Sequence, residues 1–525
     1  MTPMIIVLLL YLAILCVIAI HSAMNVKSVP DFFVAHKGAS VKAVSGSLIA
    51  TILGGSAVIG AVDAGPKLGA ATAWFMLVGS LGLLALLPFV KKAYTLGKYT
   101  LPDLIENLFG KLPRTIASIV IPLAWTGIVA AQIIASAKLL QSFTPLSYEV
   151  SATISAIIFV FYTMAGGQLS ILRTDLLQAI LILAGLVIIV LFAIGYDFTI
   201  ASSALGFASE SPTLTKNAPG FPFNSNFTPL SLFLLILTYG STFTVGPDMF
   251  SRLFCARDDR AAKKAILIAA LILIPVAATI GFLGAFGTGL GEVQGARISA
   301  IADLVVPAPL APFIALALLS VVLSSADTTL LSSSIIICEL LFRKSPSNDE
   351  TREVEKLETG KLEAGKLEAG KPLSETAENQ ECRAQHRITG KIKTQLVKDL
   401  SSLASTRYVI LANGFVAFII ALLFTDIIQM LLLALAIYAG AFIIPILFGL
   451  AGMRIKPKFV SAAIIAGGLL ALAGKLFEAT AAASFTLISA NAVMEFTAAH
   501  FSDILLIAAF AVNAGLLLIG RVREK

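Results

Sequence analysis

Two polar stretches, far apart in this chain of 525 residues, carry residue types that could hold a cation in an apolar environment. The first runs from Ala50 to Ser56 and contains Gly54-Gly55, a pair that can interrupt a helix and free carbonyl oxygens. The second, residues 321–329, is an apolar stretch with a dense run of side-chain oxygens. Lipid tolerates irregular backbone only where it is buried or lines a cavity. We therefore expect the two stretches to meet within a membrane.

The spacing of these residues predicts a site for one hard monovalent cation. Val321, Ser324 and Ser325 are spaced i, i+3 and i+4, so they share one helix face. Ala50 and Leu53 directly precede the glycine pair, where an unwound helix exposes carbonyls. Together they offer about five neutral oxygens, a shell that can replace the water of an alkali ion. The alternative is that the serines satisfy their own helix backbone or join two helices.

An acid, Asp327, follows the serines, and an acid inside an apolar span is costly and commonly functional. It could face a water-filled path or cap a neighbouring helix. A solute is expected beside the interruptions, where free N–H groups at a half-helix start favour an anionic group. We predict that it is bound by the small and polar residues on both sides: Gly54, Gly55, Ser56, Tyr239, Gly240, Ser241 and Thr242.

Composition places the chain in a membrane. Hydrophobic residues make up 58% and charged residues 13%, with a mean hydropathy of +0.92, whereas soluble domains carry about 25% charged residues. We predict an all-α protein with thirteen transmembrane helices, each long enough to cross about 30 Å of hydrocarbon. The spans are 3–22, 42–64, 70–90, 115–142, 147–167, 171–195, 229–250, 265–288, 309–341, 408–425, 428–450, 459–476 and 502–520.

Lys and Arg concentrate in alternate connections, including the one that holds Arg252, Lys263 and Lys264. The positive-inside rule makes that side cytoplasmic, with the N-terminus outside and the C-terminus inside. We expect a multi-pass protein of the plasma (inner) membrane.

Two blocks of five spans each begin with a helix interrupted by glycine. They are spans two to six (residues 42–196) and spans seven to eleven (residues 229–450). An odd number of spans gives the two blocks opposite orientations, so we predict a 5+5 inverted-repeat core. Residues 1–22 form a preceding helix, 197–228 an outer loop and 459–520 two peripheral helices. Residues 343–407 contain three five-residue repeats rich in Lys, Glu and Gly, which predict a disordered cytoplasmic loop or a regulatory docking segment.

Three segments resemble the sodium:solute symporter family, which includes the sodium/glucose and sodium/proline carriers and has a LeuT-type fold. They are Tyr162-Thr163-Met164-Ala165-Gly166-Gly167 with the following Arg173-Thr174-Asp175-Leu176-Leu177-Gln178, the segment Leu323-Ser324-Ser325-Ala326, and the glycines from Ala439-Gly440 to Gly449-Leu450. The resemblance covers roughly residues 20–470.

The resemblance implies a sodium site at Ala50, Leu53, Val321, Ser324 and Ser325, and it places Asp175 on the path by which sodium leaves. From the residues alone, Asp175 could instead pair with Arg173 at the membrane edge. This chain has Ile52 where some members carry Asp or Asn. Asp63 could supply negative charge from the outer helix end or be a solvated loop acid.

The predicted function is a sodium-coupled secondary active symporter that imports a small organic solute. An amino acid or carboxylate is favoured, and a sugar or polyol stays open. The alternative is a membrane solute sensor whose output segment is the loop 343–407. We expect no enzyme activity, since the four histidines are scattered, no cofactor besides sodium as coupling ion, and no nucleic-acid partner. The sequence does not predict an oligomeric state.

Overall fold

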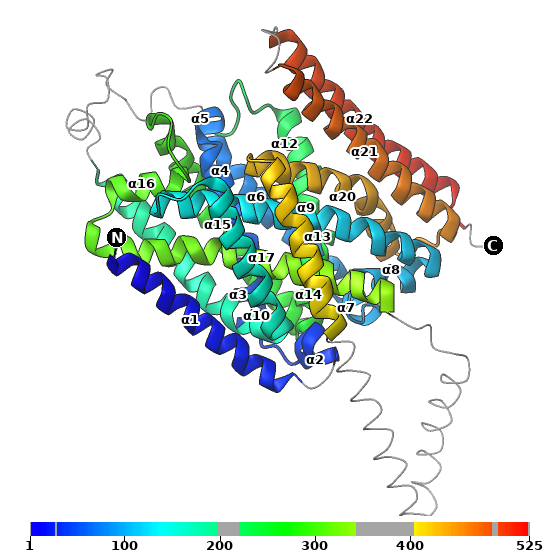
Figure 1. The fold of residues 1–525 in the computed structure, drawn as a ribbon. Coiled ribbons are helices and arrows are strands. Elements are labelled where there is room, and N and C mark those ends of the chain that lie inside the picture. The colour runs from blue at the N-terminus through cyan, green and yellow to red at the C-terminus, as the bar shows by residue number, and fades with distance from the viewer. Residues whose placement is uncertain (1, 27–28, 197–219, 343–403, 486–491, 523–525) are drawn as a thin grey trace, which may run out of the picture.

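The computed structural model describes residues 2–26, 29–196, 220–342, 404–485 and 492–522. Within these ranges the regular structure is helical, and only isolated β-bridges accompany the helices (Figure 1). The repeats of the loop 343–407 lie outside the described residues. The helices are α1 (Thr2–Asn25), α2 (Val29–Val34), α3 (Val41–Ile52), α4 (Gly55–Asp63), α5 (Gly65–Leu68), α6 (Ala73–Leu86), α7 (Val90–Leu96), α8 (Leu101–Phe109), α9 (Lys111–Phe143), α10 (Tyr148–Ile194), α12 (Pro229–Leu235), α13 (Ser241–Val245), α14 (Pro247–Cys255), α15 (Asp259–Phe286), α16 (Arg297–Val305), α17 (Ala311–Phe342), Ala404–Leu423, α20 (Ile427–Leu450), α21 (Pro457–Phe485) and α22 (Ala492–Ile519).

Eleven helical stretches in the described residues are long and apolar enough to cross a bilayer, so the all-α membrane fold is confirmed. The count of thirteen is not confirmed. Helix α1 includes the first predicted span, 3–22, but its apolar part, Leu10–Ser22, is shorter than the other eleven stretches. Two other predicted spans, 147–167 and 171–195, both lie within α10.

Helix α10 is folded at Gly167 and does not run straight through the membrane. Its 47 residues would extend about 70 Å as one straight helix, more than twice the hydrocarbon thickness. Gly167 has φ 57° and ψ −159°, a conformation that side-chain-bearing residues rarely adopt. The hydroxyl of Tyr162 donates to Thr174 Oγ1 at 2.8 Å, although these residues would be about 18 Å apart along a straight helix. The chain therefore turns back at Gly167, and α10 forms two limbs.

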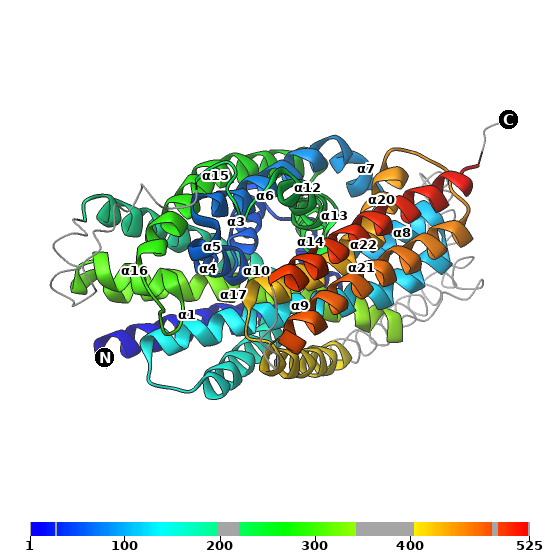
Figure 2. The same ribbon diagram turned by 90° about the horizontal axis from the view of Figure 1, so that it is seen from above.

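The interrupted helices occupy the middle of the molecule, and the terminal helices cover it. The pair α3 and α4 packs against α9, α10, α15 and α17. Helix α1 packs on α10 and α17, whereas α21 and α22 lie side by side and pack on α20 (Figures 1 and 2). Segments that are hundreds of residues apart in the sequence thus surround one central region.

Candidate ion and solute site

The first interruption lies where the glycine pair predicts it. Helix α3 ends at Ile52 and α4 begins at Gly55, with Leu53 at φ −79°, ψ 43° and Gly54 extended at φ −77°, ψ 170°. These angles suit any residue, so glycine is needed at position 54 for space. A Cβ atom there would lie 2.1 Å from Ser325 Oγ and 2.6 Å from Ser325 Cβ. The interruption is thus packed directly against α17.

The serine pair of α17 donates to the carbonyls that the interruption leaves without helical partners. In a continuous helix, Ala50 O and Thr51 O would accept from the N–H groups four residues further along. Here Ser324 Oγ donates to Ala50 O at 2.9 Å, and Ser325 Oγ donates to Thr51 O at 2.6 Å. All of these residues except Thr51 are buried. The serines thus join two helices, as the alternative expected. Ala50 O is one of the predicted ion ligands, whereas Thr51 O is not.

Most of the predicted ion ligands are brought together by this contact. Ser324 Oγ also lies 3.4 Å from Val321 O, so it stands between carbonyls of α3 and α17. Two oxygens 2.9 Å apart can share a hydrogen atom or, after the hydroxyl rotates, both face a cation. Leu53 is fully buried beside them, but no hydrogen bond within the described residues joins its carbonyl to either serine. The donor set is neutral and oxygen-only, which fits an alkali ion.

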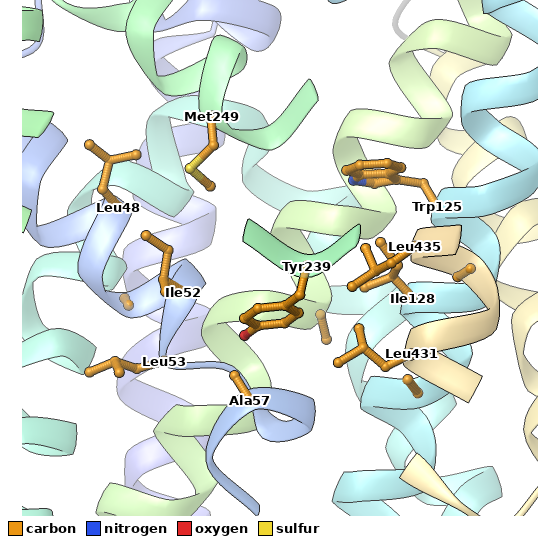
Figure 3. Close-up of a cluster of buried hydrophobic side chains, with 14 of the residues drawn as sticks. Leu48, Ile52, Leu53, Ala57, Trp125, Ile128, Tyr239, Met249, Leu431 and Leu435 are labelled. Atoms are coloured by element: carbon orange, nitrogen blue, oxygen red, sulfur yellow. The ribbon is translucent and has the colours of Figure 1, made fainter. Parts of the chain in front are cut away.

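A cavity of about 60 Å³ lies beside the interruption. Four predicted solute-binding residues line it: Gly54, Ser56, Tyr239 and Thr242. Figure 3 shows the ring of Tyr239 between Ala57 on one side and the apolar side chains of Leu431, Leu435 and Ile128 on the other. Ile52 lines the same cavity, so the position where some relatives carry a polar residue is an apolar wall here.

Three other predicted solute residues do not line this cavity. A Cβ on Gly55 would meet Val322 Cγ1 at 2.5 Å, so Gly55 allows close helix packing. A Cβ on Gly240 would lie 2.5 Å from Val78 Cγ1, which places that glycine against α6. Ser241 Oγ donates back to carbonyls of its own helix, including Thr238 O at 3.0 Å. Solute binding by these three residues stays a prediction.

The second interruption is located four residues after the one that the sequence predicts. The chain stays helical through Tyr239–Thr242, with a π-helical turn over Ile236–Gly240. The helix ends at Gly246, which is extended with ψ 144°, and α14 begins at Pro247. Proline disfavours helical conformation in the residue before it, so Gly246-Pro247 is the stronger breaking signal.

Two polar residues that the sequence analysis missed line the cavity. Gln132 of α9 donates through Nε2 to Ser56 Oγ at 2.9 Å. Asp248, two residues after the second interruption, accepts a hydrogen bond from Trp125 Nε1 at 2.8 Å. The signal was present for Asp248, because an acid in an apolar span is costly and commonly functional.

Asp175 is fully buried and pairs with Arg252, not with Arg173. Arg252 Nη2 lies 3.5 Å from Asp175 Oδ2, and Arg252 Nε donates to Ser47 Oγ at 3.1 Å. Ser47 also donates to Asp175, and Arg252 donates to Thr328, one turn beyond Ser324. Arg173 instead donates to Ser22 Oγ at 3.1 Å.

The assignment of Arg252 to a cytoplasmic connection is therefore wrong, since its side chain is 0% exposed within α14. Asp327 is buried beside this pair, and its Oδ1 accepts from Thr328 Oγ1 at 3.3 Å. The region thus holds two carboxylates and one guanidinium close to the serine pair.

The two ends of the site differ. At the end of α4 lies a larger cavity of about 560 Å³, lined by Asp63, Lys138 and residues of α20. Asp63 Oδ2 lies 3.4 Å from Lys138 Nζ and Oδ1 accepts from the Arg297 N–H at 2.8 Å, so Asp63 is paired and not simply solvated. Burial lowers the pKa of the Arg297 guanidinium from its ordinary value.

At the opposite end, Arg114 of α9 gathers three acids. Its guanidinium lies 3.1 Å from Glu106, 3.8 Å from Asp103 and 3.7 Å from Glu339 of α17. Thr100 Oγ1 donates to the same Glu339 oxygen at 3.0 Å. These contacts hold α8, α9 and α17 together at that end.

Comparison with known proteins places this geometry in a family. The profile of the sodium:solute symporter family matches residues 32–362, more than half of the chain. The rat (Rattus norvegicus) sodium/myo-inositol cotransporter 2 is 26% identical over 211 residues, 39% of this chain and 31% of that protein. The aligned part thus spans about a third of the relative. A solved structure of a Na+-coupled sialic acid symporter, substrate-bound and outward-open, superposes with a TM-score of 0.68 at 15% identity and covers 99% of both chains.

The interrupted helix, the serine pair and the all-helical architecture define a multi-pass membrane protein with a LeuT-type transporter fold. The chain belongs to the sodium:solute symporter family. The strongest part of the resemblance, from Tyr162 to Gln178, and the serine pair both lie inside the matched residues.

Proposed function

We propose that this protein is a sodium-coupled secondary active symporter that imports a small organic solute by alternating access. Sodium binds between the Ala50 carbonyl, Val321 O and the serine hydroxyls, with the Leu53 carbonyl as the fifth ligand, and the solute occupies the adjacent cavity. The observation that carries the proposal is the contact between Ser324 Oγ and Ala50 O at 2.9 Å across the helix interruption. An ion that replaces the shared hydrogen would connect α3 to α17 more strongly than the hydroxyl does.

The two ends support a direction for the cycle. The wide cavity beside Asp63 lies at the end that the charge pattern assigns to the outside, whereas the Arg114 cluster closes the other end. Sodium and solute enter from the wide cavity, and sodium leaves past Asp175 after the Arg114 contacts open. The protein resides in the plasma (inner) membrane with its N-terminus outside and its C-terminus in the cytoplasm.

The solute class rests on the cavity. It is about 60 Å³ in this conformation, so the solute is small, and the N-terminal N–H groups of α4 favour a carboxylate. An amino acid or another small carboxylate is favoured over a sugar. The sensor alternative depends on the loop 343–407, nearly all of which lies outside the described residues, and uptake by the purified protein separates the two functions.

Uptake by reconstituted vesicles tests the ion assignment. The double variant Ser324→Ala with Ser325→Ala is expected to lose sodium-dependent uptake, because two of five ligands are removed. The matched control is Ser461→Ala with Ser502→Ala, which also removes two buried hydroxyls but from the peripheral helices α21 and α22. Unchanged sodium dependence in the first variant would show that the ion binds elsewhere.

A further inference from the structure

Asp248 lines the solute cavity, and one of its carboxylate oxygens has no hydrogen-bond partner among the described residues. The residue is 6% exposed, and it lines the cavity together with Trp125 and Tyr239. Its Oδ2 accepts from the Trp125 indole at 2.8 Å, whereas Oδ1 has no hydrogen-bond partner among the described residues. The Ser332 hydroxyl is close enough to donate to this carboxylate, although no hydrogen bond of full geometry joins the two in the described chain.

The nearest buried base is already engaged. Arg252 follows Asp248 by one helical turn, but its three nitrogens contact Ser47, Ser251, Thr328 and Asp175. No ion pair within 4.0 Å joins it to Asp248 in the part of the chain that the structure describes. A buried carboxylate without a cation costs several kcal/mol in an apolar region, on the order of the penalty for any unpaired buried charge. Such a group either takes up a proton or receives a partner from outside the chain, and the lining of the cavity favours the second.

The buried charges indicate that the missing partner of Asp248 is positively charged. Around the interruptions, the described residues place three buried carboxylates, Asp175, Asp248 and Asp327, against the single guanidinium of Arg252. One sodium ion at the serine pair supplies one positive charge near Asp327 and Asp175. Asp248 then still lacks a counter-charge on the cavity side.

The walls of the cavity suit a cation as well. The rings of Trp125, Tyr239 and Phe243 line it, and the negative faces of aromatic rings attract ammonium groups within about 6 Å. Figure 3 shows Trp125 and Tyr239 on neighbouring sides of the same space. A hydroxyl could donate to Asp248, but it would leave the negative charge uncompensated.

We propose that the solute carries an ammonium group, which binds between Asp248 and the aromatic rings. This inference rests on the proposed function and narrows its solute class. An amino acid satisfies both ends of the cavity, with its ammonium on Asp248 and its carboxylate at the N-terminus of α4. A carboxylate without an ammonium group, or a neutral polyol, satisfies at most one of these two contacts.

The two tryptophans of the chain allow a direct binding assay. Trp74 lies away from the cavity, where its indole donates to Pro222 O at 2.9 Å and stacks on Phe221. The variant Trp74→Phe therefore leaves Trp125 as the sole tryptophan, hydrogen-bonded to Asp248. The probes are matched pairs. Glycine and glycolate, and alanine and lactate, differ by ammonium against hydroxyl. Choline and 3,3-dimethyl-1-butanol differ by trimethylammonium against tert-butyl, and myo-inositol is a neutral polyol.

The ammonium compounds are expected to bind in the presence of sodium and to change Trp125 fluorescence. Their dissociation constants are expected to be at least about tenfold lower than those of their neutral or anionic counterparts. Asp248→Asn is expected to remove that preference. The stabilisation of this variant by sodium, measured as a shift in melting temperature, is expected to persist because the serine pair is intact. The wild-type comparison of pairs tests the proposal even if Asp248→Asn does not fold.

The outcomes separate this inference from the proposed function. Sodium-dependent uptake restricted to glycolate, lactate or myo-inositol supports the symporter and overturns the ammonium site. So does the absence of a response to every ammonium member in a protein that sodium still stabilises. Binding of ammonium members that neither needs sodium nor leads to uptake supports the ammonium site and overturns the symporter.

Discussion

A methyl group added to Gly54 tests whether the interruption and the serine pair form one site. In Gly54→Ala the new carbon would lie 2.1 Å from Ser325 Oγ and 2.6 Å from Ser325 Cβ, far inside contact distance. The backbone angles of Gly54 suit alanine, so the effect is steric and local. The strain must push α17 away from α3 or rotate Ser325 out of its contact with Thr51 O.

The size of the effect follows from this geometry. Overpacking of a tight interior costs about 1–3 kcal/mol. If the strain is relieved by moving the serine pair, the same energy is lost from sodium binding, which corresponds to a decrease in affinity of about 5- to 150-fold. A further change, Ser325→Gly, removes both atoms that the methyl strikes. The double variant is expected to regain stability but not sodium affinity, because one of the proposed ligands is gone.

The assay is the sodium-induced rise in melting temperature of the purified protein, with potassium as the reference ion. Gly468→Ala in α21 is the control, since its Cβ would make an ordinary 3.4 Å contact with Ala441. A folded Gly54→Ala protein with wild-type sodium affinity would refute the link between the interruption and the ion.

Two further predictions concern the buried pair and the fold of α10. Arg252→Met leaves Asp175 without its cationic partner and is expected to destabilise the protein by about 3–5 kcal/mol, whereas adding Asp175→Asn recovers much of the loss. Thermal unfolding in detergent measures both variants. Equal stability of Arg252→Met and the wild type would contradict the pairing. Gly167→Ala forces a left-handed φ of 57° on alanine and a contact of 2.5 Å with Phe32. The free energy of unfolding is therefore expected to fall by at least about 1 kcal/mol in the same measurement. The control Gly468→Ala is expected to keep its stability.

The parts of the site that local signals determine could be predicted from the sequence. A glycine pair in an apolar helix marks the interruption at Gly54, and serines at i and i+1 in a late helix mark its partner. Both predictions hold because helix breaking and hydroxyl placement depend on neighbouring residues. The residue types of the two stretches already indicated that they meet, and the family resemblance implied the same ligand set.

The remaining parts depend on tertiary contacts that no local pattern encodes. Arg252 borders an apolar span, so counting charges assigned it to a loop, although Asp175 draws it into the interior. Gln132 and Asp248 become site residues only because α9 and α14 face one cavity. The second interruption was predicted at Tyr239–Thr242, with Gly246-Pro247 as the end of the span. The structure keeps Tyr239–Thr242 helical, with a π-helical turn, and breaks the helix at Gly246.

Helix α17 makes three polar contacts with other helices along its length. Its serine pair meets α3 in the middle, Thr328 holds Arg252 a turn further on, and Glu339 reaches Arg114 near the end. From Ser325 to Glu339 the helix advances about 21 Å, so a tilt of a few degrees at the middle displaces the far end by an ångström or more. A displacement of that size would take the 3.7 Å contact between Arg114 and Glu339 beyond ion-pair distance. The geometry of α17 therefore predicts that an ion bound at the serine pair would change the distance between Glu339 and Arg114 at the end of the helix.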